Sequence, residues 1–336
     1  MAIIFDKTSL KDGVVNKKWT ELDNSRALSQ SAPAAVLVPE EVYAQIDSEV
    51  KQIILDPTAD VLYNDLIGLD QGVAPLGGKI HTSKVRRDDE AGRTDVFAGS
   101  DAPTQRGSYE QNHTLILDHS VKFEFGYDEV NAIHDKNYSD LIDETASAVR
   151  SIRNRMQNAF VDGGVTAKGV PLQYQNVESF GLRSSNTRAQ KVKIGADLTK
   201  ATGAEAVTAF VNIAYELTSK SRISTPRTFY VSPEIARQLS MPAGADASIG
   251  LTTRMLIENL PEVKEIKTSN KLSGNEMLAI VLSKEHIRVL VAQPIAVSPR
   301  QRLGARDSFE WDVYAKAGLD IRTDADGHTG VAYIAK

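Results

Sequence analysis

The chain has 336 residues, of which 41% are hydrophobic and 25% are charged. These fractions are typical of folded globular proteins, and no run reaches the ~18 apolar residues that a membrane-spanning helix requires. Cysteine is absent, which excludes disulfides, thiolate metal sites and cysteine nucleophiles. The formal net charge of -5 argues against a dedicated nucleic-acid binder, because phosphate contacts require clustered lysine and arginine.

The first 38 residues show no regular alternation of apolar and polar positions. Large apolar side chains, including Phe5 and Trp19, are scattered among lysine, aspartate, serine and asparagine. This pattern predicts an extended arm that cannot form a core of its own, so we expect Phe5 and Trp19 to be covered by another surface. Met1 to Asp6 also lack the pattern of an export signal, so we expect folding in the cytoplasm.

A helix is predicted directly after this arm. Pro39 lies in its first turn, glutamates follow at the positive end of the helix dipole, and Asp56-Pro57 ends it. Its apolar positions recur with helical spacing at Val42, Ile46, Val50 and Ile53. This stripe predicts one buried face.

Residues 75–113 predict a long β-hairpin, because pieces of alternating pattern are separated by glycines. Its charged tip contains Arg86, Arg87, Asp88, Asp89, Glu90 and Arg93. Strands of about 15 to 20 residues would reach roughly 50 to 65 Å. A two-stranded ribbon is not stable alone in water, so the hairpin is expected to lie on another surface. Its tip is either a solvated turn or an ion-pair network between subunits.

A strand with strict alternation is predicted from His113 onward. Its apolar face contains Leu115, Leu117, Val121, Phe123 and Phe125, and its polar face Thr114, Asp118, Ser120, Lys122 and Glu124. The strongest helical pattern follows from Ser139 to Phe160 and ends at Gly163-Gly164. At 1.5 Å per residue this helix spans roughly 33 Å, long enough to be the spine of a domain.

Helices and strands alternate in the second half of the chain. Helices are predicted at about 204–220, 233–239 and 252–259, and strands at 228–231, 263–268, 277–282, 287–291, 309–321 and 330–334. The buried face of the first helix is expected to contain Val207, Phe210, Val211, Ala214 and Leu217. A turn at Asp326-Gly327 joins the last two strands. Together these elements predict an α+β protein.

Two short patterns resemble ligand sites but lack the required groups. Gly72–Ile80 resembles a phosphate-binding loop, yet its lysine is displaced by one residue and no serine or threonine follows it. Asp324–Gly327 resembles a calcium loop, but the first and last ligand positions would be Arg322 and Tyr333. We therefore interpret the first as a flexible hairpin base and the second as a surface turn.

The sequence also offers few candidate residues for a metal site or a catalytic site. His113 and His119 share one face of a strand but lie about 20 Å apart along it, too far for one metal ion. The short signatures of serine hydrolases, zinc proteases and dinucleotide-binding folds do not occur. We therefore predict no catalytic, cofactor-binding or metal-binding residue, and no enzymatic function.

The order of these parts resembles the major capsid proteins of tailed bacteriophages, whose Hong Kong 97-type fold is shared with encapsulins. Two segments also have residue patterns similar to those of this family: Thr228–Glu234, which precedes a helix, and Phe309–Ile321, near the end of the chain. The resemblance covers nearly the whole chain. It implies an α+β fold with an N-terminal arm, a long β-hairpin called the E-loop, a peripheral domain with a spine helix, and an axial domain.

This resemblance implies a division of the chain into six regions. They are the N-terminal arm (1–38), the N-terminal helix region of the peripheral domain (39–67), the E-loop (68–113), the peripheral domain with the spine helix (114–164), the axial domain (165–290) and the return strands of the peripheral domain (291–336).

The resemblance also implies a function. The chain would be a structural protein that self-assembles into an icosahedral phage head enclosing double-stranded DNA without sequence-specific binding. Its partners would be copies of itself in pentamers and hexamers, with separate scaffolding, portal and decoration proteins allowed and no membrane. It would assemble in the cytoplasm of a bacterial host and reside in the virion capsid. The expected intersubunit contacts are Phe5 and Trp19 of the arm and Lys79, Lys84, Arg86, Arg87, Asp88, Asp89, Glu90 and Arg93 of the hairpin.

One family feature is missing. Some relatives join a hairpin lysine covalently to a late asparagine, assisted by a buried glutamate. Lys79 and Lys84 lie in the hairpin, but no asparagine follows Asn275. We therefore expect a shell held by burial, strand pairing and salt bridges. Two alternatives remain open: an encapsulin-type compartment with protein cargo, and an α/β hydrolase-type enzyme with dispersed active residues.

Overall fold

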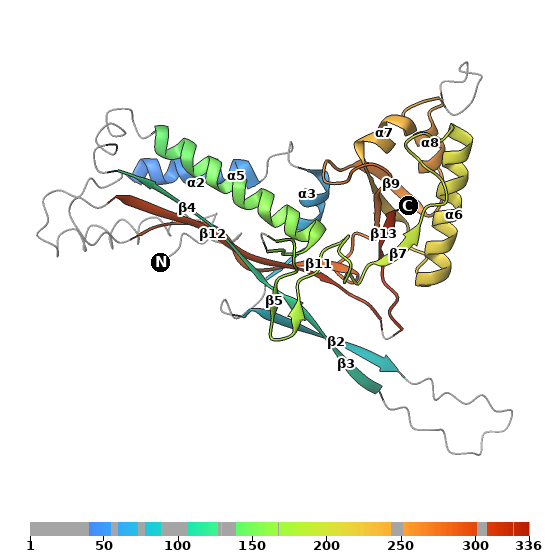
Figure 1. The fold of residues 1–336 in the computed structure, drawn as a ribbon, viewed down its shortest axis with the longest axis horizontal. Helices are drawn as coiled ribbons and strands as arrows, with labels where there is room; N and C mark the ends of the chain where they lie inside the picture. The colour runs from blue at the N-terminus through green and yellow to red at the C-terminus, as the bar shows by residue number, and fades with distance from the viewer. Residues whose placement is uncertain are drawn as a thin grey trace, which may run out of the picture.

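Figure 1 shows the fold of the chain in a computed structural model. The structure describes residues 40–54, 60–72, 78–88, 107–126, 129, 139–166, 168–242, 251–300, 308–324 and 326–335. Within these residues the strands form a four-stranded sheet, a five-stranded sheet and two two-stranded hairpins. None of the helices in these ranges combines the length and apolar composition needed to cross a membrane.

Two predicted helices that pack together in one core are confirmed. They are α2 (Glu40–Ile54) and α5 (Ser139–Asp162). The four predicted apolar positions of α2 are buried in one core with the stripe of α5. After α5, Gly163 has a φ of +83°, and a Cβ there would lie 3.1 Å from the backbone of Phe180. Glycine is therefore required both for the left-handed backbone and for the close approach.

The spine helix α5 lies along the four-stranded sheet (Figure 1). The strand order is β1 (Asp70–Gly72), β11 (Ile287–Pro299), β12 (Phe309–Ile321) and β4 (Leu117–Phe125). An aromatic cluster closes one end of this core, where the rings of Phe123 and Trp311 stack with centroids 5.6 Å apart. The short helix α3 (Val61–Ile67), which the sequence pattern did not predict, begins at Asp60, whose carboxylate accepts the Leu62 N–H at 2.9 Å.

The five-stranded sheet separates two cores. Its order is β7 (Gln190–Lys193), β13 (Val331–Ala335), β10 (Met277–Ile280), β8 (Arg227–Val231) and β9 (Val263–Thr268). Phe229 and Val231 pack with the helices α6 (Gly203–Ser221), α7 (Pro233–Leu239) and α8 (Thr253–Glu258), whereas Tyr230 faces the core of α2 and α5. Ser232 caps α7, since its hydroxyl accepts the Ile235 N–H.

The predicted β-hairpin is confirmed over its described part. Strand β2 (Ile80–Asp88) pairs antiparallel with β3 (Gly107–Leu115), with Ile80 opposite Leu115. The pair extends away from the body of the molecule (Figure 1). A second small hairpin, β5 (Gln173–Tyr174) with β6 (Val177–Glu178), lies against β3.

Two details of the sequence interpretation are wrong. The single strand predicted after His113 is two strands, because the chain leaves the hairpin at Ile116 and enters β4 of another sheet. Val211 was expected to be buried, but 44% of it is exposed on the outer side of α6. The predicted turn at Asp326-Gly327 joins β12 to β13, and these two strands belong to different sheets.

The strands of the two sheets alternate in groups along the second half of the chain. Strand β11 of the four-stranded sheet begins at Ile287, and β13, near the end of the chain, lies in the five-stranded sheet. The two sheets are therefore interleaved along the chain rather than consecutive.

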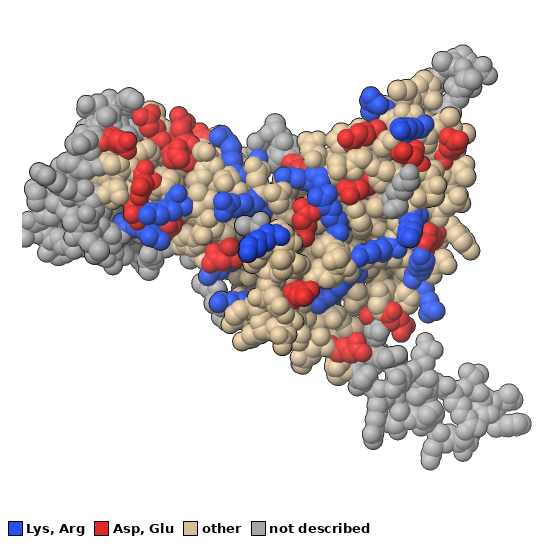
Figure 2. All heavy atoms as spheres, viewed as in Figure 1, with Lys and Arg blue, Asp and Glu red and all other residues tan. Residues whose placement is uncertain are grey.

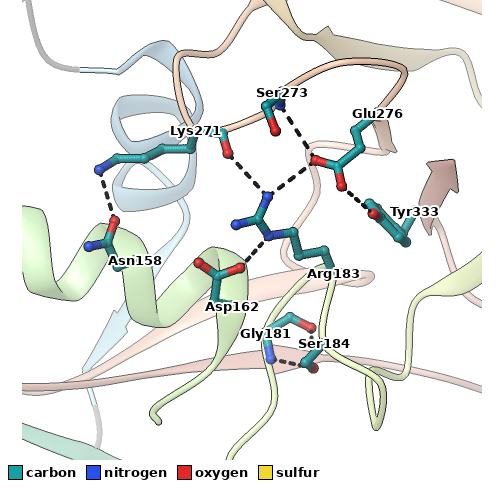
Figure 3. A network of polar contacts seen from close by, with 9 residues as sticks. All are labelled: Asn158, Asp162, Gly181, Arg183, Ser184, Lys271, Ser273, Glu276 and Tyr333. Carbon is teal, nitrogen blue, oxygen red and sulfur yellow. Dashed lines mark hydrogen bonds and ion pairs between the residues drawn. The ribbon is translucent and has the colours of Figure 1, made fainter. Parts of the chain in front are cut away.

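A network of polar contacts, which we call a polar seam, joins the end of α5 to the five-stranded sheet (Figure 3). Arg183 forms ion pairs with Asp162 at the end of α5 and with Glu276 before β10, the latter at 3.2 Å. Glu276 Oε1 also accepts the Tyr333 hydroxyl of β13 at 2.9 Å. Burial is the main cause and the Glu276 carboxylate the second cause that raise the pKa of Tyr333 to about 12. The Tyr333 hydroxyl therefore stays protonated and donates its hydrogen bond. Lys271 completes the seam by donating to Asn158 Oδ1 at 2.8 Å.

A second seam fixes α3 against the five-stranded sheet. Asp65 accepts the Tyr230 hydroxyl and lies 2.8 Å from the Lys267 ammonium, while Asp60 accepts the Ser269 hydroxyl at 2.8 Å. Burial and the neighbouring Asp65 carboxylate raise the pKa of Tyr230. Because each seam is charge-assisted and partly buried, α5 and α3 are held against the five-stranded sheet. We call the two sheets with their helices the tile.

Gly318 is predicted to be essential where the hairpin leaves the body. A Cβ at this position in β12 would lie 2.6 Å from the Leu115 carbonyl oxygen, a backbone atom that cannot rotate away. Gly318→Ala should lower the free energy of unfolding by about 1–3 kcal/mol, measured by urea denaturation. Gly195→Ala, where nothing lies within 4 Å, is the matched control and should change it little. Equal effects in both variants would contradict this assignment.

Candidate assembly interface

The root of the hairpin is organised around Asp320 of β12, whose side chain is fully buried. Its Oδ1 accepts the Thr114 hydroxyl at 2.9 Å, and its Oδ2 accepts Arg288 Nε at 2.9 Å. Arg188 lies 3.8 Å from Oδ1. A buried carboxylate is tolerated only when it is paired and hydrogen-bonded, and these three groups satisfy that requirement.

The two arginines connect this carboxylate to both strands of the hairpin. Arg188 Nη2 donates to the His113 carbonyl oxygen of β3 at 2.6 Å. Arg288 Nη2 lies 3.3 Å from His81 Nε2 of β2, and its Nη1 donates to Gln71 Oε1 of β1 at 2.7 Å. The direction in which the hairpin leaves the body is therefore set by one buried carboxylate.

The contact with Arg288 also determines the protonation of His81. A guanidinium has only donors, so His81 Nε2 must accept and the ring must be neutral, with its proton on Nδ1. Burial lowers the pKa of His81, Asp320 opposes this and Arg288 reinforces it. Burial likewise lowers the pKa of Arg188, against the attraction of Asp320. The root is thus built for a neutral histidine beside two cations and one anion.

An exposed apolar surface lies at the foot of the hairpin. We call it the foot patch, and it consists of Val165, Val170, Leu172 and Tyr174. A bridge between Val165 and Pro171 folds this segment back on itself. The Lys79 ammonium, just before β2, lies 4.6 Å from the centroid of the Tyr174 ring. Large apolar groups gathered on a surface mark an interaction site more often than single exposed ones do.

The structure places only some of the predicted contact residues. Lys79 and Lys84 are exposed, Lys79 at the foot patch and Lys84 within β2. The backbone of Arg86, Arg87 and Asp88 belongs to β2, while their side chains lie outside what the structure describes. Phe5, Trp19, Asp89, Glu90 and Arg93 lie wholly outside the described residues. An intersubunit role for all ten stays a prediction.

Sequence reasoning missed the Asp320 network. It assigned Thr114 to the solvent face, but Thr114 is 2% exposed because it donates to Asp320. The partners come from four distant segments, so their spacing carries no motif. The one signal was an aspartate between two large apolar residues, Leu319 and Ile321, at the end of a predicted strand.

The Asp326-Gly327 turn forms as predicted, with Gly327 at a φ of +81°. Asp324, Asp326 and His328 bring ligand atoms within 4.8 Å of one another. Asp324 Oδ1 already accepts the N–H groups of Asp326 and His328, and its Oδ2 lies 2.8 Å from His328 Nδ1. The Asp324 carboxylate therefore serves the turn itself.

Comparison with known families covers almost the whole chain. Residues 31–334 match the model of a family of unknown function (DUF6260). The chain belongs to this family. No curated protein matches this DUF6260 chain.

Three solved structures with a similar fold are distant in sequence. The capsid of Myoviridae phage XM1 matches with a TM-score of 0.60 and 12% identity, over 77% of the DUF6260 chain and 86% of the capsid chain. A virus-like particle from Pyrococcus furiosus matches with a TM-score of 0.58 and 13% identity, over 88% and 99%. A Microbacterium phage Oxtober96 chain matches with a TM-score of 0.55 and 13% identity, over 80% and 90%. The DUF6260 chain therefore has the Hong Kong 97-type capsid fold that the resemblance implied.

Removing the Asp320 carboxylate should be far more costly than removing a surface carboxylate of the same strand. Asp320→Ala leaves two arginines without their buried partner and should lower the free energy of unfolding by about 3–5 kcal/mol. Asp312→Ala, which breaks only an exposed pair with Arg300, should cost less than about 1 kcal/mol. Chemical denaturation measures both, and limited proteolysis should show faster cleavage in the hairpin only for Asp320→Ala. Similar losses for the two variants would contradict the assigned role.

The hairpin root should also weaken as the pH falls. Because the pKa of His81 is lower folded than unfolded, the unfolded state binds more protons between the two values. Stability should therefore be full above the ordinary histidine pKa of 6.5 and decrease below it. His81→Gln keeps an acceptor that does not titrate, so hydrogen exchange of residues 78–88 should lose part of its acid sensitivity. His328→Gln is the control, and an unchanged pH profile in His81→Gln would rule this out.

Proposed function

We propose that the chain is the major capsid protein of a tailed phage, which assembles with copies of itself into an icosahedral shell around double-stranded DNA. The observation that carries this proposal is the match of the fold over nearly the full length of shell proteins, namely 86% of the XM1 capsid chain and 99% of the Pyrococcus furiosus particle chain. The hairpin of β2 and β3, which is fixed at its base by the Asp320 network, also supports this proposal. It extends from the tile without a core of its own.

The hairpin and the foot patch would supply much of the association energy. An isolated two-stranded ribbon is marginal in water, and Tyr109 on β3 is 64% exposed in the single chain. A neighbouring copy that covered this strand and the foot patch would bury both. Each contact is weak, but a subunit in a closed shell makes several of them at once. After the first contact forms, the others form at high effective concentration, so their effects combine.

Charge supports enclosure of DNA rather than tight binding to it. The net charge is -5, and on the face shown in Figure 2 the basic side chains are spread out rather than gathered in one patch. Sequence-independent binding to DNA requires clustered cations, which this face does not present. In this proposal the partners are further copies in pentamers and hexamers, with separate scaffolding, portal and decoration proteins. Assembly takes place in the bacterial cytoplasm, and the product resides in the virion.

A second candidate is an encapsulin-type compartment, which the match to the Pyrococcus furiosus virus-like particle supports no better than the phage matches support the capsid. The same tile would then enclose protein cargo instead of a genome. Nuclease-resistant DNA that co-purifies with particles supports the capsid, and a co-purified enzyme supports the compartment. The comparisons give the hydrolase alternative no support, because the matched chains come from a capsid and a virus-like particle.

The full chain should elute in the void volume of a size-exclusion column and show closed particles in negative-stain micrographs. Val170→Ser with Tyr174→Ser should lower the assembled fraction roughly tenfold at the same concentration, because each contact is repeated many times over the shell. Gln173→Ser, a polar change on the same small hairpin, is the control and should assemble normally. Circular dichroism verifies that all variants are folded. A folded wild-type chain that stays a small oligomer would overturn the proposed function.

A further inference from the structure

The outer strands of the five-stranded sheet are β7 and β9. An outer strand presents backbone N–H and C=O groups to which a strand of another molecule can add. Copies packed in a shell, as in the proposed function on which this point rests, would meet such strands at high local concentration. A free edge would therefore favour open polymers over closed particles.

Strand β9 is not free at its centre. It pairs in parallel with β8 on one side, where Phe229 lies opposite Ile266. Arg254 Nη2 donates to the Ile266 carbonyl oxygen at 2.6 Å, and Glu258 Oε1 accepts the Ile266 N–H at 3.4 Å. Both backbone groups of Ile266 are thus bonded by side chains of α8 rather than by another strand.

These two side chains form a unit, which we call the edge clamp. Arg254 Nε lies 2.8 Å from Glu258 Oε1, one turn apart on α8. The clamp presents one donor and one acceptor to the same residue, as a neighbouring strand would. The strand is also irregular beside it, since Arg227 lies opposite Val263 and Thr228 opposite Glu265, so that Lys264 is left out of register. Bulges and edge lysines are further means of blocking strand addition.

We infer that the edge clamp closes β9 against strand addition, so that copies of this chain associate through the hairpin and foot patch and not by pairing across β9. A foreign strand could bond to Ile266 only after the carbonyl and N–H gave up charged partners. The ion pair would also lose contact with water in that new interface. The barrier therefore acts on association, beyond any effect on the stability of α8.

A matched pair of residues separates these two effects. Glu216 and Lys220 form the same type of ion pair, one turn apart on α6, and are similarly exposed. Within the described part of the chain, this pair bonds to no strand backbone. Removing it tests the general effect of losing a helical ion pair.

The experiment compares the full-length double variants R254A/E258A and E216A/K220A with wild type. Dissociated subunits are incubated at neutral pH, and cross-β material is followed by a fibril-binding dye and by sedimentation. R254A/E258A should produce at least about fivefold more dye-binding material than wild type, because the edge of β9 is then open. E216A/K220A should stay within about twofold of wild type. Equal amounts from the two variants, or no increase in R254A/E258A, would overturn the inference.

A conservative variant distinguishes sealing from loss of folding. R254K/E258Q keeps a donor and an acceptor beside Ile266 and should return the dye signal close to the wild-type level, whereas a signal equal to that of R254A/E258A would count against sealing. All samples are held below the thermal transition of the least stable variant. Negative staining of the same samples reports shell formation separately, so failure of the proposed function and failure of the clamp give different results.

Discussion

A charge removed from water must be neutralised where it is buried, and in this protein that constraint acts at Asp320. The carboxylate sits at the junction of the four-stranded sheet and the hairpin, and it is satisfied only when Thr114, Arg188 and Arg288 converge on it. Because the same arginines bond to both hairpin strands, the hairpin cannot change direction without breaking the Thr114 bond to this carboxylate and both arginine contacts. The most exposed feature of the molecule is thus controlled from its interior.

The rest of the tile follows the same division of labour. Apolar burial makes the two cores, while the polar seams at Arg183 and Asp65 fix α5 and α3 against the five-stranded sheet. Association between copies would use apolar surface that the single chain leaves exposed, and the edge clamp would prevent the non-specific pairing that sheets permit. In this proposal, attraction and exclusion are assigned to different elements of the chain.

Sequence reasoning succeeded where local periodicity reports burial directly. The spacing of Val42, Ile46, Val50 and Ile53 allows only one buried helical face, and α2 has that face. It failed where burial depends on a neighbour: Val211 has the spacing of the α6 core positions but faces outward. The hairpin could be predicted from its glycines and alternation, but its root could not, because the four segments that meet at Asp320 carry no common motif.

By itself the sequence determined the α+β class, the long helices, the hairpin and the absence of thiol chemistry, since these depend on composition and on periods of a few residues. Only the tertiary structure decided that one predicted strand divides at Ile116 between two sheets, that β13 crosses into the five-stranded sheet, and that Asp320 and Arg254 serve as anchor and clamp. The reason is physical: register and charge pairing are settled between segments distant in the chain, where a residue's partner, not its neighbours in sequence, determines its environment.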